Sequence, residues 1–242
     1  GVSAGCPTML ALESRTQTKR YRSGVCALNG LSFTVAGKEI FGLLGPNGAG
    51  KSTLLNILTT YFKPTDGEVV MLGKDLVQNP AWARTQIACV AQQVSIDAHL
   101  SLKVNMLFQS RLYRVEGATA KLRIERLIEA FDLKDYLKYP TASFSGGVKR
   151  RLDIAMNMVS LPTILFLDEP TVGMDVHSRK AMWEMLESIR DEFGTTVFLT
   201  THYLEEADAL CDSVCVMKQG RTLAQGPLHQ LRASFRQNLL LI

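Results

Sequence analysis

The sequence has no apolar run long enough to cross a membrane. A spanning helix needs about 20 consecutive, mostly apolar residues, whereas the longest apolar stretches here, such as residues 164–167, are only a few residues long. Residues 1–8 also lack the basic and apolar segments of a signal peptide. We therefore expect that the chain does not cross a membrane alone and that residues 1–8 form a flexible end.

Paired cysteines are missing too. The five cysteines form an odd set without a C-x-x-C pair, so the sequence indicates neither a disulfide framework nor a zinc site. We expect the cysteines to be small, buried apolar residues in a reducing cytosol.

The sequence also lacks a large excess of either positive or negative charge. The net charge is +4, and the basic residues are scattered among acidic ones, which is not typical of a nucleic-acid-binding surface. We therefore expect no nucleic-acid partner. With 242 residues and 46% apolar content, the chain suits one large globular domain or two closely packed small ones.

Short apolar runs bounded by Gly, Pro or polar turn residues predict strands. Helical periodicity follows the strand at two places, within residues 40–60 and 164–192, and this predicts an α/β fold with a parallel sheet. A closing helix is expected at residues 227–235. The predicted strands are residues 31–35, 40–44, 69–72, 87–90, 164–167, 197–199 and 214–217, with a short edge strand at 221–226.

Residues 101–139 contain no strand candidate. Their pattern is helical, with a break near Gly117, and it predicts a helical subdomain. Apolar residues at helical spacing should face the core. They are Leu102, Met106, Phe108, Leu112, Leu122, Leu127 and Phe131.

The segment GPNGAGKST at residues 45–53 is a phosphate-binding loop motif. It fits G-x-x-x-x-G-K-[ST], and it follows a predicted strand and precedes a predicted helix, as that motif requires. Its glycines let the backbone N–H groups surround phosphates, Lys51 reaches the terminal phosphates, and Ser52 can ligate Mg²⁺. The expected nucleotide contacts are Gly45, Pro46, Asn47, Gly48, Ala49, Gly50, Lys51, Ser52 and Thr53.

An acidic strand end, ILFLDEP, supplies the carboxylates that such a site needs. Asp168 should hold the metal, directly or through water, because the metal requires an anchored carboxylate beside the phosphates. The adjacent Glu169 is placed to polarise an attacking water.

A second glycine turn, FSGG, precedes a helix about a hundred residues after the first. Its Ser145, Gly146 and Gly147 would suit another phosphate, yet no second lysine loop is present to complete another site. The simplest solution is a second copy of the chain, arranged head to tail, so that two half-sites make two whole ones. We interpret the basic triplet at 149–151 as a solvated helix face, with anion contact as the alternative.

In their order along the chain, these motifs resemble those of the nucleotide-binding domain of ATP-binding cassette transporters, from about residue 9 to 235. The resemblance rests on GPNGAGKST, Gln92 after the strand IACVA, FSGG, ILFLDEP, TVGMD and LTTHY. It implies a P-loop ATPase core with a parallel sheet, an N-terminal antiparallel β portion and an inserted helical subdomain at about 95–160. Residues 236–242 would then form a C-terminal tail.

The resemblance also implies roles for residues that are weak signals alone. Tyr21 looks like the aromatic residue that stacks on adenine, and Asp175 like the residue that communicates across the dimer. His202 looks like the switch that contacts the γ-phosphate. Gln92, favoured over its neighbour Gln93, looks like the residue that links the metal site to a membrane subunit. The implied catalytic set is Lys51, Gln92, Glu169 and His202, and the implied metal ligands are Ser52, Gln92 and Asp168.

The resemblance implies an ATPase that uses ATP and Mg²⁺. FGLLGPNGAGKSTLLNIL and TTHYLEEADALCD look most like ATPase subunits of type-2 exporters of drugs, polysaccharides or lipids. The expected partners are a separate transmembrane permease and a second copy of the chain or a homologous ATPase subunit, at the cytoplasmic face of a membrane. A domain cut from a larger lipid transporter would look similar. The alternative is a soluble ATPase of the same type acting on ribosomes or DNA.

Overall fold

The computed structural model of the chain describes residues 9–232. The predicted flexible end at 1–8, the predicted tail at 236–242 and the end of the predicted helix at 227–235 lie outside the described residues. The chain divides into two compact units. The first unit contains the described residues up to 85 and from 201 onward, and the second contains residues 86–200.

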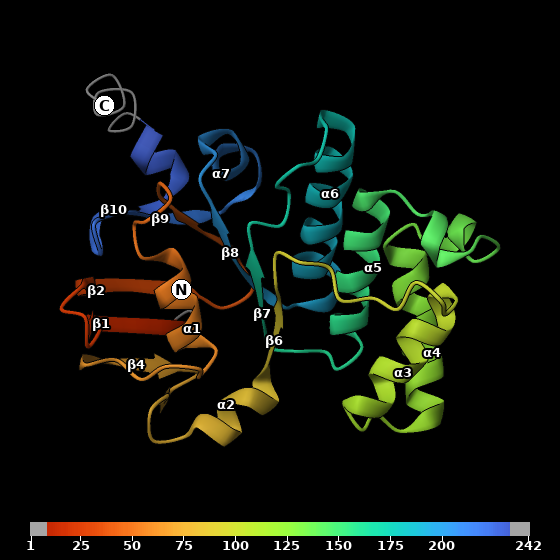
Figure 1. Ribbon diagram of the computed structural model, residues 1–242, viewed down its shortest axis with the longest axis horizontal. Coiled ribbons are helices and arrows are strands. Elements are labelled where there is room, and N and C mark those ends of the chain that lie inside the picture. The colour runs from red at the N-terminus through yellow and green to blue at the C-terminus, as the bar shows by residue number, and fades with distance from the viewer. Residues whose placement is uncertain (1–8, 233–242) are drawn as a thin grey trace, which may run out of the picture. The chain divides into compact units, whose positions relative to one another are not determined.

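The first unit contains an antiparallel sheet with the strand order β2-β1-β4-β5 (Figure 1). It confirms the antiparallel β portion. The sequence analysis predicts no strand at β1, because this segment is rich in polar residues. Neighbours pair with β1 along both edges, so backbone pairing compensates for its polar sequence. The strands are β1 (Leu10–Arg20), β2 (Cys26–Ala36), β4 (Asp66–Met71) and β5 (Lys74–Asp75).

Three further strands of this unit adjoin in the order β10-β9-β3. β3 runs parallel to β9, β9 is antiparallel to β10, and every residue of β3 is buried. The strands are β3 (Ile40–Leu44), β9 (Ser213–Lys218) and β10 (Arg221–Pro227), the helices are α1 (Lys51–Leu58), α2 (Pro80–Gln86) and α7 (Leu204–Leu210), and residues 228–232 are helical.

The second unit contains three parallel strands in the order β8-β7-β6. Their apolar runs are continuous because the central strands of parallel sheets are covered on both faces. The predicted parallel sheet is therefore confirmed. The elements are β6 (Ile87–Val90), β7 (Ile164–Asp168), β8 (Thr196–Thr201) and the helix α6 (Val176–Phe193), and residues of β8 up to Thr200 belong to this unit.

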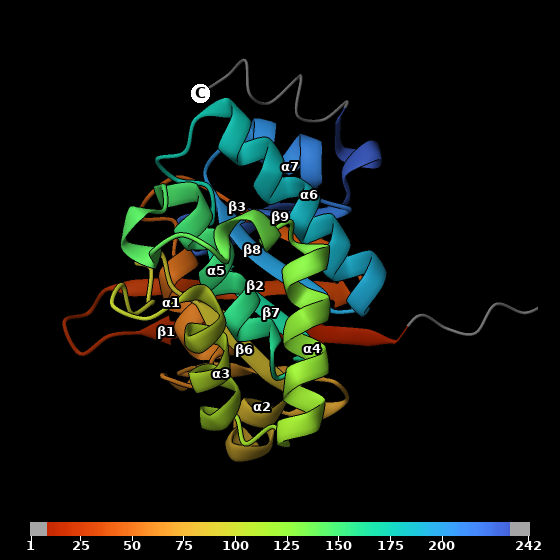
Figure 2. The same cartoon turned by 90° about the vertical axis from the view of Figure 1, so that its right-hand side faces the viewer.

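The second unit also contains the α-helices α3 (Leu102–Leu112), α4 (Gly117–Ala130) and α5 (Gly146–Met158), and two short 3₁₀ helices, Lys134–Tyr136 and Thr141–Ser143. α5 packs against α3, α4 and α6 (Figure 2). α4 begins at the predicted break, where the Glu116 carboxylate accepts hydrogen bonds from the backbone N–H groups of Ala118 and Thr119. The boundaries 95–160 and 9–235 remain predictions.

The predicted core stripe of these helices is only partly right. Leu102, Met106, Leu127 and Phe131 are buried, but Phe108, Leu112 and Leu122 are 51%, 77% and 70% exposed. Phe108 follows Met106 by two positions, which is about 200° around a helix, so the two cannot share one narrow face. Because α3 is covered on one side only, its second apolar row, Phe108 and Leu112, faces solvent.

Two of the cysteines contradict the expected burial. Cys211 and Cys215 are buried, whereas Cys26 and Cys89 are exposed, and all four are free thiols. Cys26 begins a strand and Cys89 lies on β6, the last strand in its sheet order, so one side of each is uncovered. Cys6 lies outside the described residues. Among the helices within residues 9–232, none has the length and apolar character that crossing a bilayer demands.

Candidate functional site

The phosphate loop of the first unit joins β3 to α1 and depends on glycine at two positions. Gly50 caps α1 with φ of 105°, and a Cβ there would lie 2.6 Å from the carbonyl oxygen of Ala27. A Cβ on Gly45 would lie 2.7 Å from the carbonyl oxygen of Met217. Only glycine fits such close approaches of backbone to backbone. The loop therefore has the tight, side-chain-free form that lets N–H groups approach an anion.

Lys51 opens α1 and is only 7% exposed. Its Nζ donates hydrogen bonds to the carbonyl oxygens of Gly45, at 2.5 Å, and of Thr201, at 3.3 Å. The ammonium group is thus held against the loop at the positive end of the helix, an arrangement that favours phosphate. The next residue, Ser52, is exposed.

Tyr21, the predicted adenine-stacking residue, lies next to this loop. Its hydroxyl is 2.9 Å from the Thr53 hydroxyl in a hydrogen bond. The Phe62 ring meets the Tyr21 ring edge-on at 6.2 Å, and Nζ of Lys19 lies 5.7 Å from the Tyr21 ring centre. These contacts favour a role for Tyr21 beside the loop, and stacking on adenine stays a prediction.

His202 follows directly after Thr201, whose carbonyl oxygen accepts hydrogen bonds from Lys51 and from the Gly45 N–H. The His202 ring packs against Tyr203, with 3.9 Å between ring centres. The structure therefore brings the backbone at His202 next to the phosphate loop, as the predicted switch role requires.

The second unit brings the predicted acidic residues together through Thr200, which is fully buried. The Thr200 hydroxyl donates to Oδ1 of Asp168 at 2.8 Å and accepts from the N–H of Glu169 at 3.0 Å. Oε2 of Glu169 accepts a hydrogen bond from Nε2 of Gln92 at 3.4 Å. This contact favours Gln92 over Gln93. Sequence reasoning missed Thr200, because a threonine in a strand is an ordinary strand former.

Glu169 has an unusual backbone for a glutamate. Its φ is +44°, in the left-handed region that costs a residue with a side chain about 1–2 kcal/mol. Backbone strain of this kind concentrates at functional sites. The positive φ agrees with the predicted catalytic role of Glu169 but does not by itself identify it, because residues without such a role, Leu72 and Gln219 among them, share it.

The FSGG turn caps α5. Oγ of Ser145 accepts from the Val148 N–H at 3.3 Å, so the turn and the helix start are one unit. A Cβ on Gly147 would lie 3.1 Å from Oγ of Ser178. Oδ1 of Asp175 caps α6 by accepting a hydrogen bond from the Ser178 N–H at 2.7 Å. Hydrogen bonds from the backbone and the side chain of Ser178 lower the pKa of Asp175. Asp175 and the FSGG turn thus share a neighbour, Ser178.

The basic triplet after FSGG is not the solvated face that we predicted. Arg150 is only 8% exposed, and its Nη1 donates a hydrogen bond to the carbonyl oxygen of Ala91. Nη1 of Arg151 donates to the carbonyl oxygen of Phe131 at 3.0 Å. Both guanidinium groups satisfy backbone carbonyls that α5 covers, a use that charge patterning does not reveal.

No group of three or more His, Cys, Asp or Glu side chains within the described residues could hold a metal ion. Mg²⁺ does not need such a group, because it is usually bound through one or two carboxylates, waters and the phosphates of a substrate. Asp168, which is oriented by Thr200, and the exposed Ser52 have the oxygen donors that fit this cation.

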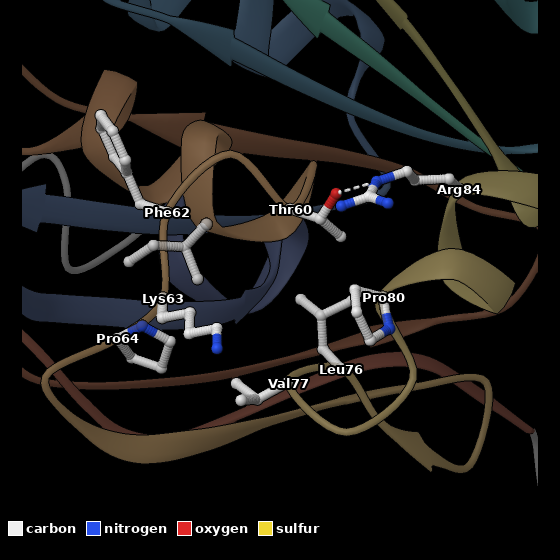
Figure 3. A pocket seen from close by; sticks show the side chains of 9 residues that line it. Thr60, Phe62, Lys63, Pro64, Leu76, Val77, Pro80 and Arg84 are labelled. Carbon is white, nitrogen blue, oxygen red and sulfur yellow. Dashed lines mark hydrogen bonds between the residues drawn. The ribbon is translucent and has the colours of Figure 1, made fainter.

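A small pocket of the first unit lies beside the C-terminal end of α1 and is not the predicted nucleotide site (Figure 3). Its volume is about 100 Å³, well below the roughly 300–1,000 Å³ of most ligand pockets. Ile57 and Leu76 form part of its apolar wall, and Nε of Arg84 donates to Oγ1 of Thr60 at 2.8 Å beside it. None of the predicted site residues lines it.

The phosphate loop after a buried strand, together with an acidic strand end, defines the class of P-loop nucleotide-binding α/β proteins. A family model described as "ABC transporter" matches residues 28–172. The chain belongs to the ABC transporter family, as its ATP-binding domain. The resemblance and the fold class predicted from the sequence are confirmed, and so is the enzyme class, because domains of this family bind and hydrolyse ATP.

Curated relatives agree with this assignment. The chain is 40% identical over 230 residues to the daunorubicin/doxorubicin resistance ATP-binding protein DrrA of Streptomyces peucetius, covering 95% of the chain and 69% of that protein. It is 39% identical over 227 residues to the Nod factor export ATP-binding protein I of Rhizobium meliloti (strain 1021), covering 94% of the chain and 67% of that protein. The chain therefore spans about two thirds of the length of these relatives.

A solved structure gives the same result. CbiO1 from Clostridium perfringens, part of the ABC transporter complex cbiONQ, superposes with a TM-score of 0.87 at 27% identity. The match covers 96% of this chain and 95% of that one.

Proposed function

We propose that this chain is the ATP-hydrolysing part of an exporter that moves its substrate through a separate transmembrane permease. The relatives named for drug resistance and for Nod factor export support the direction of transport. The observation that carries the proposal is the arrangement of Asp168, Glu169 and Gln92. Thr200 donates to Asp168 and accepts from the N–H of Glu169, and Gln92 donates to the Glu169 carboxylate.

Each predicted residue has a distinct task. Lys51 and the N–H groups of its loop bind the phosphates, and Tyr21 stacks on the base. Ser52 and Asp168 ligate Mg²⁺, with Gln92 as a further ligand. When bound, Mg²⁺ neutralises charge that develops on the phosphates. Glu169 accepts the proton of the attacking water, and His202 contacts the γ-phosphate.

We propose that two copies act as a head-to-tail pair. The FSGG turn of one copy, with Ser145, Gly146 and Gly147, then contacts the γ-phosphate held by Lys51 of the other copy. Asp175 lies at the interface between the two copies. The exposure of Ser145 and Gly146 supports this role, because the turn remains available to a second chain. Loss of these contacts after hydrolysis separates the copies, since charge-assisted hydrogen bonds are worth about 1.5–3 kcal/mol each.

The proposed permease has a candidate docking surface in the second unit. Residues 95–100, which come shortly after Gln92 in the sequence, line a groove of about 690 Å³ together with residues of α3 and Met156 of α5. Its rim carries Phe108 and Leu112, which are 51% and 77% exposed. Large apolar side chains exposed beside a groove are typical of interaction sites. Docking there would place the chain at the membrane surface as a peripheral subunit.

The hydrolysis proposal is tested with Glu169→Gln. This change keeps the shape of the side chain but removes the proton acceptor, so ATP should still bind while turnover falls by about 10²–10⁴-fold. A nucleotide-bound pair should accumulate. ATP affinity is measured by calorimetry, turnover by phosphate release, and pairing by light scattering. Unchanged turnover would remove Glu169 from catalysis.

The permease proposal is tested with the double variant Phe108→Ser, Leu112→Ser. Both side chains are exposed, so the fold should persist while co-purification with a hydrophobic membrane subunit is lost. Leu122→Ser is the matched control, because Leu122 is 70% exposed on α4 and does not line the groove. Recovery of ribosomes or DNA instead of a membrane subunit would support the alternative ATPase.

A further inference from the structure

Arg150 and Asp153, both on α5, contact the two ends of the loop that carries Gln92. Nη1 of Arg150 donates to the carbonyl oxygen of Ala91, which directly precedes Gln92. Oδ2 of Asp153 accepts from the N–H of Ser95, at 3.4 Å. α5 therefore holds residues 91–95 at their first and last positions.

The two side chains also form a pair with each other. Nη1 of Arg150 lies 3.9 Å from Oδ2 of Asp153, and the residues are 8% and 3% exposed. Burial lowers the pKa of Arg150 and raises the pKa of Asp153. Since a buried charge is tolerated only when its partner and hydrogen bonds are in place, removing either side chain should release the loop.

The same helix begins at the FSGG turn, where Ser145 is the cap and Gly146 the first residue. A helix transmits displacement along its axis because its backbone hydrogen bonds keep it nearly rigid. The turn at one end of α5 and the Gln92 loop beside its second turn therefore cannot shift independently while Arg150 and Asp153 hold the loop.

We propose that Arg150 and Asp153 are positioning residues that couple the Gln92 loop to the FSGG turn. Displacement of the turn, when its contacts to the second copy form or break, is then carried to Gln92 and so to its hydrogen bond with Glu169. The inference rests on the proposed ATPase cycle, and it adds residues to which the sequence motifs gave no role.

The first experiment measures the loop itself by hydrogen exchange in the full chain. Arg150→Met should speed exchange of the amides at residues 92–95 by about tenfold or more, since local opening is no longer opposed. Lys149→Met is the matched control, because it removes a neighbouring cation that contacts neither end of the loop in the hydrogen bonds described. Arg150→Lys, which keeps a donor, should restore part of the protection.

The second experiment measures whether Arg150 acts through Gln92. Arg150→Met should lower kcat by about 10–100-fold, the range expected for a misplaced catalytic group, with little change in the KM for ATP. In a Gln92→Ala background the same change should lower kcat no further, because a double-mutant cycle reveals a shared effect as non-additivity. A purely structural role would lower kcat by the same factor in both backgrounds.

Two results would overturn the coupling: equal exchange in Arg150→Met and Lys149→Met, or full additivity with Gln92→Ala. Should Arg150→Met fail to fold, Asp153→Asn, which removes the negative charge that faces Arg150, carries the same measurements. If the unaltered chain hydrolysed no ATP, the proposed function would fail, while hydrogen exchange would still decide whether Arg150 and Asp153 hold the loop.

Discussion

At the scale of single residues, Thr200 shows how one buried hydroxyl can orient two acidic residues. It donates to Asp168 and accepts from the N–H of Glu169, so it fixes a carboxylate and a backbone turn at once. Neither interaction is visible in the sequence, because Thr200 and Asp168 meet only when β8 pairs with β7.

We expect Thr200→Val to separate shape from hydrogen bonding at this position. Valine fills the same space but leaves the Glu169 N–H without its acceptor, which should cost about 1–3 kcal/mol of stability and slow hydrolysis. Thr200→Ser, which retains the hydroxyl, is the control. Chemical denaturation and phosphate release measure the two effects. Equal behaviour of the valine and serine variants would contradict the assigned role.

The positive φ of Glu169 leads to a second prediction for a single residue. Glycine adopts this backbone conformation without the steric cost that alanine incurs. Glu169→Gly should therefore be more stable than Glu169→Ala by about 1 kcal/mol, although both lose turnover. Thermal or urea denaturation of the two variants tests this difference, and a more stable alanine variant would show that the backbone at residue 169 is not strained.

At the scale of elements, the apolar strands were the most predictable parts. Strands 40–44 and 87–90 have the predicted bounds, because burial on both faces demands an unbroken apolar run. β1 was missed because its sequence LALESRTQTKR is mostly polar. The exposed row of Phe108 and Leu112 was misassigned to the core because periodicity does not reveal which face a neighbouring element covers.

The start of α4 gives a prediction at this scale. Hydrogen bonds from the backbone N–H groups of Ala118 and Thr119 lower the pKa of Glu116 below its ordinary value of 4.5. The unfolded chain then takes up this proton before the folded chain does. The stabilisation by the cap is therefore fully present above pH about 4.5 and is lost as the pH falls through the lowered pKa of the folded state.

Glu116→Gln tests this pH dependence. The difference in melting temperature between the unaltered chain and the variant should be constant above pH about 5 and should shrink as the pH falls below the ordinary pKa of glutamate. Glu125→Gln, at an exposed position on the same helix, controls for the loss of one charge. A difference that grows on acidification would contradict the cap.

At the scale of the whole molecule, the proposed pairing of copies predicts complementation. A Lys51→Met variant and a Ser145→Arg variant should each hydrolyse ATP poorly when alone. In a mixed pair, one site combines the intact Lys51 of one copy with the intact Ser145 of the other. An equal mixture should regain up to about a quarter of the unaltered rate, since half of the pairs are mixed and each has one intact site of two.

Phosphate release from the mixture, compared with each variant alone at the same total concentration, measures this gain. As a control for a change near the FSGG turn, the same measurement is made with Lys149→Met replacing Ser145→Arg in the mixture. A mixture no more active than its components would mean that each chain completes its site by itself.

The sequence by itself determined the family, the phosphate loop, the acidic strand end and the buried strands. These features are local: a few adjacent residues must have a particular chemistry, and their order along the chain identifies them. Tertiary structure alone decided which polar residues serve those motifs. Thr200 orients Asp168 and Glu169, and Arg150 and Asp153 hold the Gln92 loop, because hydrogen bonds between residues far apart in sequence exist only after the strands and helices have packed.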